Sequence, residues 1–169
     1  MFRPIQIALA ITALATLAPS TAHAAPCWAP PVTARVTDPF REPACRWCAG
    51  NRGIEYGTPP GTTVRAVAGG RVSFAGDVAG TTYVVVRHRD GLRTTYGNLR
   101  HTHLDDGDLV VRGARVGTTD GRLHFGLRDG SRYVDPSPYL GRWMRRPRLI
   151  PVDGSPGRPS PPATLRCTR

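Results

Sequence analysis

Polar and apolar residues alternate over short stretches of this chain, and glycine-containing turns separate the stretches. Such patterns cover residues 63–68, 71–75, 83–88, 92–96, 109–111, 114–117, 123–128 and 132–134. No segment of ten or more residues repeats its apolar residues with the 3.6-residue period of a helix. Asp90-Gly91 lies between two strand patterns and predicts a hairpin, and Gly69-Gly70 predicts a second turn. The sequence therefore predicts an all-β, antiparallel domain.

The N-terminal residues have the composition of a secretory signal peptide. Arg3 precedes the apolar run of residues 5–17, and Ala22-His23-Ala24 offers a cleavage site with small residues. The apolar run is shorter than the ~20 residues that span a bilayer, which disfavours an uncleaved membrane anchor. We therefore expect residues 1–24 to be removed, the mature protein to lie outside the cytoplasm in the cell envelope or medium, and no membrane span to remain.

The four cysteines, Cys27, Cys45, Cys48 and Cys167, all follow the expected cleavage site. An even number of cysteines in an exported chain predicts two disulfides, for which three pairings exist. We favour Cys45–Cys48 with Cys27–Cys167, and the second bond would tie the two ends of the chain together. A redox role for the first pair is disfavoured, because no βαβ pattern surrounds it.

The basic residues are unusual because lysine is absent. All 23 are arginine, and against 12 acidic residues they give a formal charge of +11. One interpretation is attraction to an anionic polymer, such as an acidic glycopolymer of a cell wall. The other is a GC-rich genome, which encodes arginine where other genomes encode lysine. No basic run alternates with aromatic residues, so we expect no nucleic-acid partner.

Five sequence blocks follow one another along the chain, at residues 35–41, 52–66, 84–99, 107–113 and 123–136. In their order and spacing they resemble the lysostaphin-type, or LytM-like, zinc peptidases that cut peptidoglycan cross-links. The resemblance to this family covers residues 35–140. The resemblance implies a compact antiparallel two-sheet domain of the duplicated-hybrid-motif type. An extended Pro- and Cys-rich segment, residues 25–50, leads into this domain, and residues 141–169 read as an irregular Arg- and Pro-rich tail.

The family holds one Zn²⁺ through His, Asp and His, and two further His residues assist the reaction. The resemblance places the three ligand positions at Asn51, Glu55 and His124, and the two assisting positions at Asn98 and Arg122. An amide is a weaker zinc ligand than an imidazole, and it takes up no proton near neutral pH. A guanidinium does not exchange protons at all in this range. We therefore expect no intact catalytic residue, and zinc binding that is weak or absent.

The resemblance and the charge of the chain leave three candidate functions. The favoured one is an inactive envelope module that binds peptidoglycan or a cell-wall hydrolase, as inactive members of the family do when they activate amidases. Arg122, Asn98 and Tyr96 are its candidate groove and ligand contacts. The second is an active zinc metalloendopeptidase, in which His101 and His103 could rebuild a metal site, although a solvated loop is the favoured interpretation of that pair. The third is a structural envelope domain held by charge.

Overall fold

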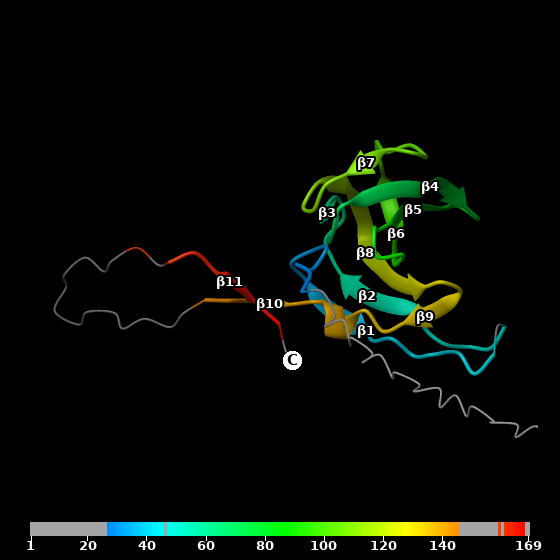
Figure 1. Ribbon diagram of the computed structural model, residues 1–169, viewed down its shortest axis with the longest axis horizontal. Coiled ribbons are helices and arrows are strands. Elements are labelled where there is room, and N and C mark those ends of the chain that lie inside the picture. Colours follow the sequence, from blue (N-terminus) through cyan, green and yellow to red (C-terminus); the bar gives the residue numbers. More distant parts are fainter. Residues whose placement is uncertain (1–26, 46, 146–158, 160, 168–169) are drawn as a thin grey trace, which may run out of the picture.

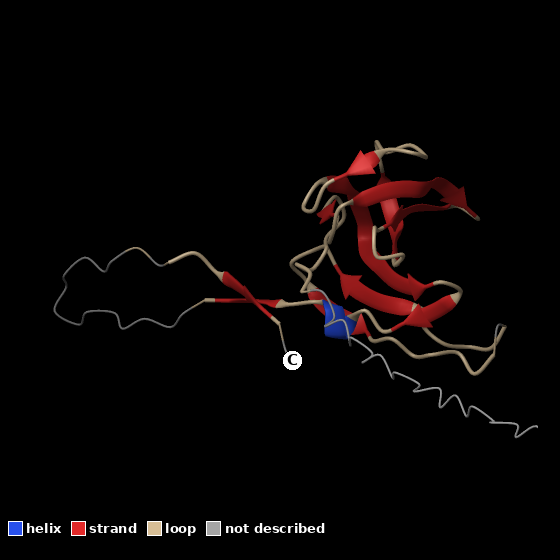
Figure 2. Cartoon of the chain, in the orientation of Figure 1, coloured by secondary structure: helices blue, strands red, loops and turns tan. Residues whose placement is uncertain are grey.

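The computed structural model describes residues 27–45, 47–145, 159 and 161–167, so the expected signal peptide lies outside the described residues. The described chain is almost entirely β-structure (Figure 2). Its strands are β1 (Arg35–Asp38), β2 (Gly53–Gly57), β3 (Thr63–Arg65), β4 (Gly70–Val78), β5 (Thr81–Arg87), β6 (Arg93–His101), β7 (Leu109–Val110), β8 (Arg115–Asp129), β9 (Arg132–Val134), β10 (Arg142–Met144) and β11 (Thr164–Arg166), with one 3₁₀ turn, η1 (Ser137–Tyr139). None of the described helical segments is long and apolar enough to cross a membrane.

Hydrogen bonds join nine of the strands into one antiparallel sheet. The main order is β1-β2-β8-β6-β5-β4-β7, and β3 and β9 also pair with β8. Figure 1 shows β8 curving between one part of the sheet with β1, β2 and β9 and another with β4, β5 and β7. The predicted all-β antiparallel fold is confirmed, and the curvature of β8 makes it compact.

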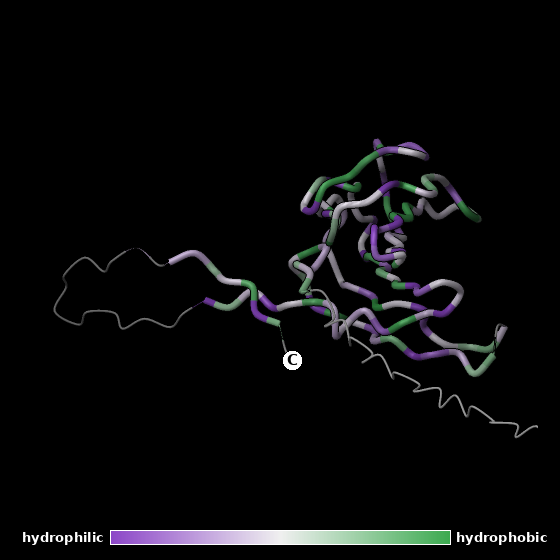
Figure 3. The backbone as a smooth tube through the Cα atoms, in the orientation of Figure 1, coloured by the Kyte–Doolittle hydropathy of each residue, from purple (hydrophilic) through white to green (hydrophobic). Residues whose placement is uncertain are grey.

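The core follows from the alternation of side chains along the strands, which Figure 3 shows as alternating hydropathy. One face of the sheet buries the large side chains of Ile54, Tyr96, Leu123, Phe125 and Leu127. The Tyr96 and Phe125 rings lie 5.4 Å apart between their centroids. The other face carries polar residues and glycines, and it holds the family positions identified from the sequence.

Two of the predicted strand boundaries are wrong for a shared reason, namely glycine-rich stretches that do not act as hairpin turns. Only Thr63–Arg65 of residues 63–68 forms a strand, and it pairs with β8 rather than across Gly69-Gly70 with β4. Residues 114–117 and 123–128 belong to the single strand β8. Gly121 has a φ of 93° and bends this strand without ending it. By contrast, the hairpin predicted at Asp90-Gly91 is confirmed between β5 and β6.

The tail was expected to be irregular, but its described residues include a short hairpin. β10 and β11 pair antiparallel and project from the main sheet (Figure 1).

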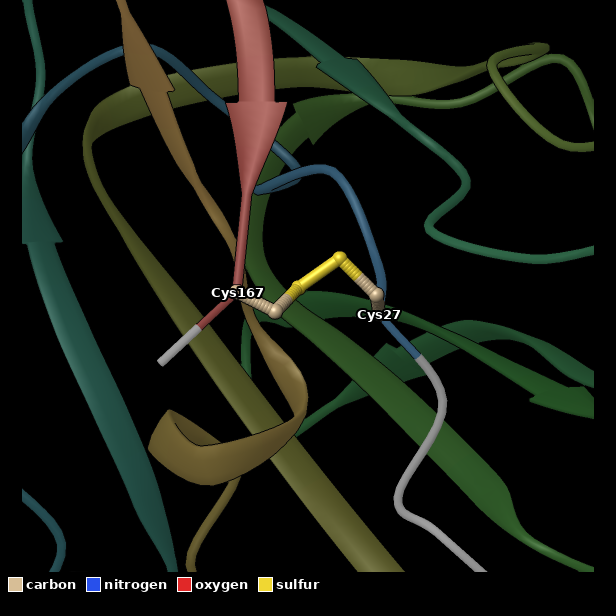
Figure 4. Close-up of a disulfide and its surroundings, with 2 residues drawn as sticks. All are labelled: Cys27 and Cys167. Atoms are coloured by element: carbon tan, nitrogen blue, oxygen red, sulfur yellow. A yellow bond between two sulfur atoms is a disulfide. The ribbon is translucent and has the colours of Figure 1, made fainter. Parts of the chain in front are cut away.

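The favoured disulfide pairing is confirmed, with bonds Cys45–Cys48 and Cys27–Cys167. Figure 4 shows Cys167, just after β11, joined to Cys27. This bond lies next to Trp28, which is buried against the rings of His88 and Tyr139.

Candidate metal centre

The centre of the candidate site is a direct contact between two side chains on neighbouring strands. Glu55 in β2 stands opposite His124 in β8, and both point away from the core face because their neighbours Ile54, Leu123 and Phe125 are buried. His124 Nδ1 lies 2.6 Å from Glu55 Oε1, with each side chain 21% exposed. The second carboxylate oxygen, Oε2, is buried and has no hydrogen-bond partner among the described residues.

Two glycines make room for the His124 ring. A Cβ on Gly53 would lie 2.8 Å from His124 Cε1 and 2.5 Å from the carbonyl oxygen of Phe125. A Cβ on Gly126 would lie 3.4 Å from His124 Nε2. The imidazole therefore lies close to the backbone of these two strands, with Nδ1 turned toward Glu55. This need for space explains why residue 53, between the first two ligand positions, is a glycine.

Asn51, the first ligand position, is used to shape the loop before β2. Its side chain is buried, and its amide nitrogen donates to the carbonyl of Pro39 at 3.0 Å. Its amide oxygen accepts a hydrogen bond from the backbone N–H of Gly53 at 3.3 Å. Both ends of the amide are therefore occupied by backbone groups.

A second acidic side chain stands near the Glu55–His124 pair, but it is held by an arginine. Asp38 in β1 is opposite Glu55 in the sheet register. Its carboxylate forms a two-point ion pair with the guanidinium of Arg41. The hydrogen bond from Arg41 is the main cause that lowers the pKa of Asp38 below its usual value. Asp38 is therefore an ionised partner of Arg41 and does not replace the missing third ligand.

Asn98 occupies the first assisting position in an unusual backbone conformation. Its φ is 59°, in the left-handed region that asparagine tolerates better than most residues. The pairing of β6 with β8 shifts register at this residue, between Gly97 and Leu99. A Cβ on Gly97 would lie 2.4 Å from the Tyr83 ring and 3.3 Å from His124 Cβ. Tyr83, which the sequence did not single out, therefore lies over the sheet beside His124.

Arg122 and Tyr96 differ in solvent exposure, and therefore in whether a ligand can contact them. Arg122 is exposed on β8, two residues before His124 and on the same face. It stands opposite Gly57, which has no side chain to cover it. Tyr96 is wrong as a candidate contact, because it is fully buried and its hydroxyl accepts a hydrogen bond from the Val67 N–H at 3.0 Å. Burial raises the pKa of Tyr96 to about 12.

The residues at these positions do not fit the three-ligand zinc site of the family. Glu55 and His124 are close together, but their nearest atoms bind each other, and the amide of Asn51 is held by the backbone. No group of three or more His, Cys, Asp or Glu side chains in the described parts of the chain is arranged to hold a metal ion. His101 and His103 are both exposed and do not belong to such a group.

Comparison with known proteins identifies the scaffold. Residues 49–136 match the family described as peptidase family M23. The chain is 28% identical over 130 residues to the uncharacterized lipoprotein YgeR of Escherichia coli, covering 72% of this chain and 50% of that protein. It is 35% identical over 105 residues to the murein hydrolase activator EnvC of the same organism, covering 57% of this chain and 24% of EnvC.

A solved structure gives the same result at the level of the fold. Csd3 of Helicobacter pylori superimposes with a TM-score of 0.60 and 28% sequence identity, over 68% of this chain and 33% of the Csd3 chain. The chain spans half or less of the length of the curated relatives that it matches. Since the family match covers more than half of its residues, this chain is a member of peptidase family M23.

Proposed function

We propose that this protein is an exported M23 module that binds peptidoglycan without cleaving it. The observation that carries the proposal is the Asn51 amide, whose two ends are bound by backbone groups where the family has a ligand imidazole. Glu55 and His124 alone leave a divalent cation with two protein donors instead of three. The assisting positions, Asn98 and Arg122, carry groups that cannot accept a proton near neutral pH.

The exposed face around Arg122 supports a binding role. The guanidinium of Arg122 is accessible, and the peptides of the cell wall carry carboxylates that it can bind in a two-point manner. Asn98 is half-buried on β6, the other neighbour of β8, and offers an amide for hydrogen bonds with peptide groups. Export is part of this proposal; the apolar start of the sequence and the similarity to a lipoprotein support it.

A binding partner among cell-wall hydrolases is the second candidate, and the similarity to EnvC favours it. EnvC is named as an activator of murein hydrolases, and this chain matches a quarter of its length. An adaptor of this kind would use the same exposed face, with a protein in place of the wall polymer.

The test combines cleavage with binding. Purified mature protein is incubated with cell-wall peptidoglycan with and without added Zn²⁺, and released fragments and bound metal are measured. We expect no release and no stoichiometric zinc. Cleavage that needs zinc and that His124→Ala abolishes would establish an active peptidase instead.

Binding is measured by sedimentation with insoluble peptidoglycan over a salt series. We expect binding to persist at ~0.5 M salt, where long-range attraction is screened, and Arg122→Ala to reduce it several-fold. Arg100→Ala, which removes another exposed arginine, is the matched control and is expected to bind like the parent. Binding that disappears at high salt in all three proteins would support an envelope domain held by charge. Absence of binding at any salt, with capture of a purified amidase, would support the adaptor role.

A further inference from the structure

Four arginines stand opposite one another on four neighbouring strands. Arg71 pairs with Arg87 between β4 and β5, Arg87 with Arg93 between β5 and β6, and Arg93 with Arg128 between β6 and β8. Each is followed or preceded by a buried residue, so all four project from the face that carries His124. Because neighbouring strands are ~4.8 Å apart, the row extends over about 14 Å. We call these four residues the arginine row.

No ion pair with an acidic side chain is seen for the arginine row among the described residues. Like charges directly opposite each other destabilise a sheet, so such a row has a cost that folding alone does not explain. The ion pairs Arg41–Asp38 and His124–Glu55 seen among the described residues do not involve the row. Three of its guanidinium groups instead donate to loop carbonyls, Arg71 to Gly107, Arg93 to Gly130 and Arg128 to Ser131. These neutral acceptors fix the guanidinium groups and leave their positive charge in place.

At the β8 end, the row meets a surface pocket of about 890 Å³. The Tyr133 ring contacts two guanidinium groups there, with Arg128 Cζ 4.9 Å and Arg52 Cζ 5.5 Å from its centroid. Trp47, on the loop closed by the Cys45–Cys48 bond, also lines the pocket and is 86% exposed. Glu42 lines it as well, and no ion pair joins Glu42 to Arg128.

The guanidinium of Arg128, which lines the pocket, has one donor that the fold leaves unsatisfied. Arg128 Nε is buried and has no hydrogen-bond partner among the described residues. A buried donor without an acceptor is costly, and a small movement of the Arg128 side chain toward an oxyanion in the pocket would give it one. The positive charge of the row and this unsatisfied donor therefore both favour an oxyanion as the ligand.

We propose that the arginine row and the Tyr133 pocket bind a linear anionic glycopolymer that carries phosphate or carboxylate groups. Planar guanidinium groups match both kinds of oxyanion, and a row of them matches a chain with repeated charges. Exposed aromatic rings of the pocket, such as Trp47, suit sugar faces. Nucleic acid is disfavoured, because single-strand binders place successive aromatic rings along the charged path, and the four positions here are all arginine.

This inference goes beyond the proposed function and does not rest on it. Arg128 is four residues along β8 from His124, so the row is separate from the Glu55–His124 contact and from Arg122. An active peptidase or a hydrolase adaptor could carry the same surface. Failure of one proposal therefore leaves the other standing.

The chain contains a matched control for the test. Arg65 and Arg115 are also paired across two strands, β3 and β8, and Arg65 donates to the carbonyl of Gly113 at 3.0 Å. The double variant Arg87→Gln/Arg93→Gln is therefore compared with Arg65→Gln/Arg115→Gln. Both remove two positive charges and one arginine-to-glycine hydrogen bond, and only the first alters the row. Circular dichroism and melting curves check that both variants fold.

Affinity is measured by titration with long-chain polyphosphate and with polygalacturonate at several salt concentrations. We expect the row variant to bind at least ~10-fold more weakly at low salt and to lower the salt slope by about 1.4–1.8, as the loss of two phosphate contacts predicts. The control variant should retain most of the affinity. A preference for polyphosphate identifies a phosphate polymer, and a preference for polygalacturonate identifies a carboxylate polymer.

Three results would overturn the proposal. They are equal losses in the two double variants, no binding of either polymer by the parent, or tighter binding of a single-stranded oligonucleotide of equal charge. If the row variant does not fold, the single variants Arg87→Gln and Arg115→Gln repeat the comparison, since both residues are exposed.

Discussion

The absence of a side chain at Gly53 leaves the space that the His124 ring occupies next to Glu55. A methyl group at this position would lie 2.5 Å from the carbonyl oxygen of Phe125, so the backbone of β2 and β8 must shift to accept it. We expect Gly53→Ala to lower the free energy of unfolding by about 1–3 kcal/mol, as overpacking does. The same shift should move the imidazole away from Glu55, which changes the NMR signals of the His124 ring.

The control for this substitution is Gly76→Ala in β4. The nearest atom to its new methyl group would be Phe74 Cζ at 3.4 Å, which is close to ordinary contact. Its unfolding free energy should stay within ~0.5 kcal/mol of the parent. Equal stability of the two variants would show that β2 and β8 adapt to a side chain at Gly53.

The backbone at Asn98 limits what can replace a histidine there. With a φ of 59°, the position accepts Asn and His far better than a β-branched residue. We expect Asn98→Val to lower the unfolding free energy by about 1–3 kcal/mol and Asn98→His to change it by less than ~1 kcal/mol, measured by urea denaturation. A tolerated valine would contradict the left-handed conformation in solution.

At the scale of the element, strands with clear alternation and a clear turn could be predicted from sequence. The β5–β6 hairpin is the best example, because Asp90-Gly91 sits between two apolar runs. β8 was divided into two, because local patterns cannot show that Gly121 bends a strand whose partners change from β3 to β6 and β2. The β10–β11 pair was missed because its pairing joins residues twenty or more apart in a Pro-rich tail.

The candidate site also has features that could be predicted from the sequence and features that could not. The resemblance to the family identified Glu55 and His124, and the register of β2 and β8 brings them together. The resemblance could not show that the Asn51 amide binds the loop backbone, or that Tyr96 faces the core, because both depend on packing between distant segments. The arginine row was hidden for the same reason: its members are spread over residues 71–128 and become neighbours only through strand pairing.

At the scale of the whole molecule, the two disulfides have different physical effects. Cys27–Cys167 joins residues 140 apart, and Cys45–Cys48 joins residues only three apart. A bond that closes a longer loop removes more entropy from the unfolded chain, and typical losses on its removal are about 2–4 kcal/mol. The longer bond also holds Trp28 in place, where its ring packs on Tyr139 and His88.

We therefore expect Cys27→Ser/Cys167→Ser to lower the free energy of unfolding by about 2–4 kcal/mol, and Cys45→Ser/Cys48→Ser to lower it by clearly less. Urea denaturation followed by the fluorescence of Trp28 and the other tryptophans measures both losses. Polymer binding should respond in the opposite order, because Cys45 lines the Tyr133 pocket and neither Cys27 nor Cys167 does. Its removal should weaken polyanion affinity at nearly unchanged stability. A larger stability loss from Cys45–Cys48 than from Cys27–Cys167 would contradict the assignment of the first bond to the pocket and of the second to the fold.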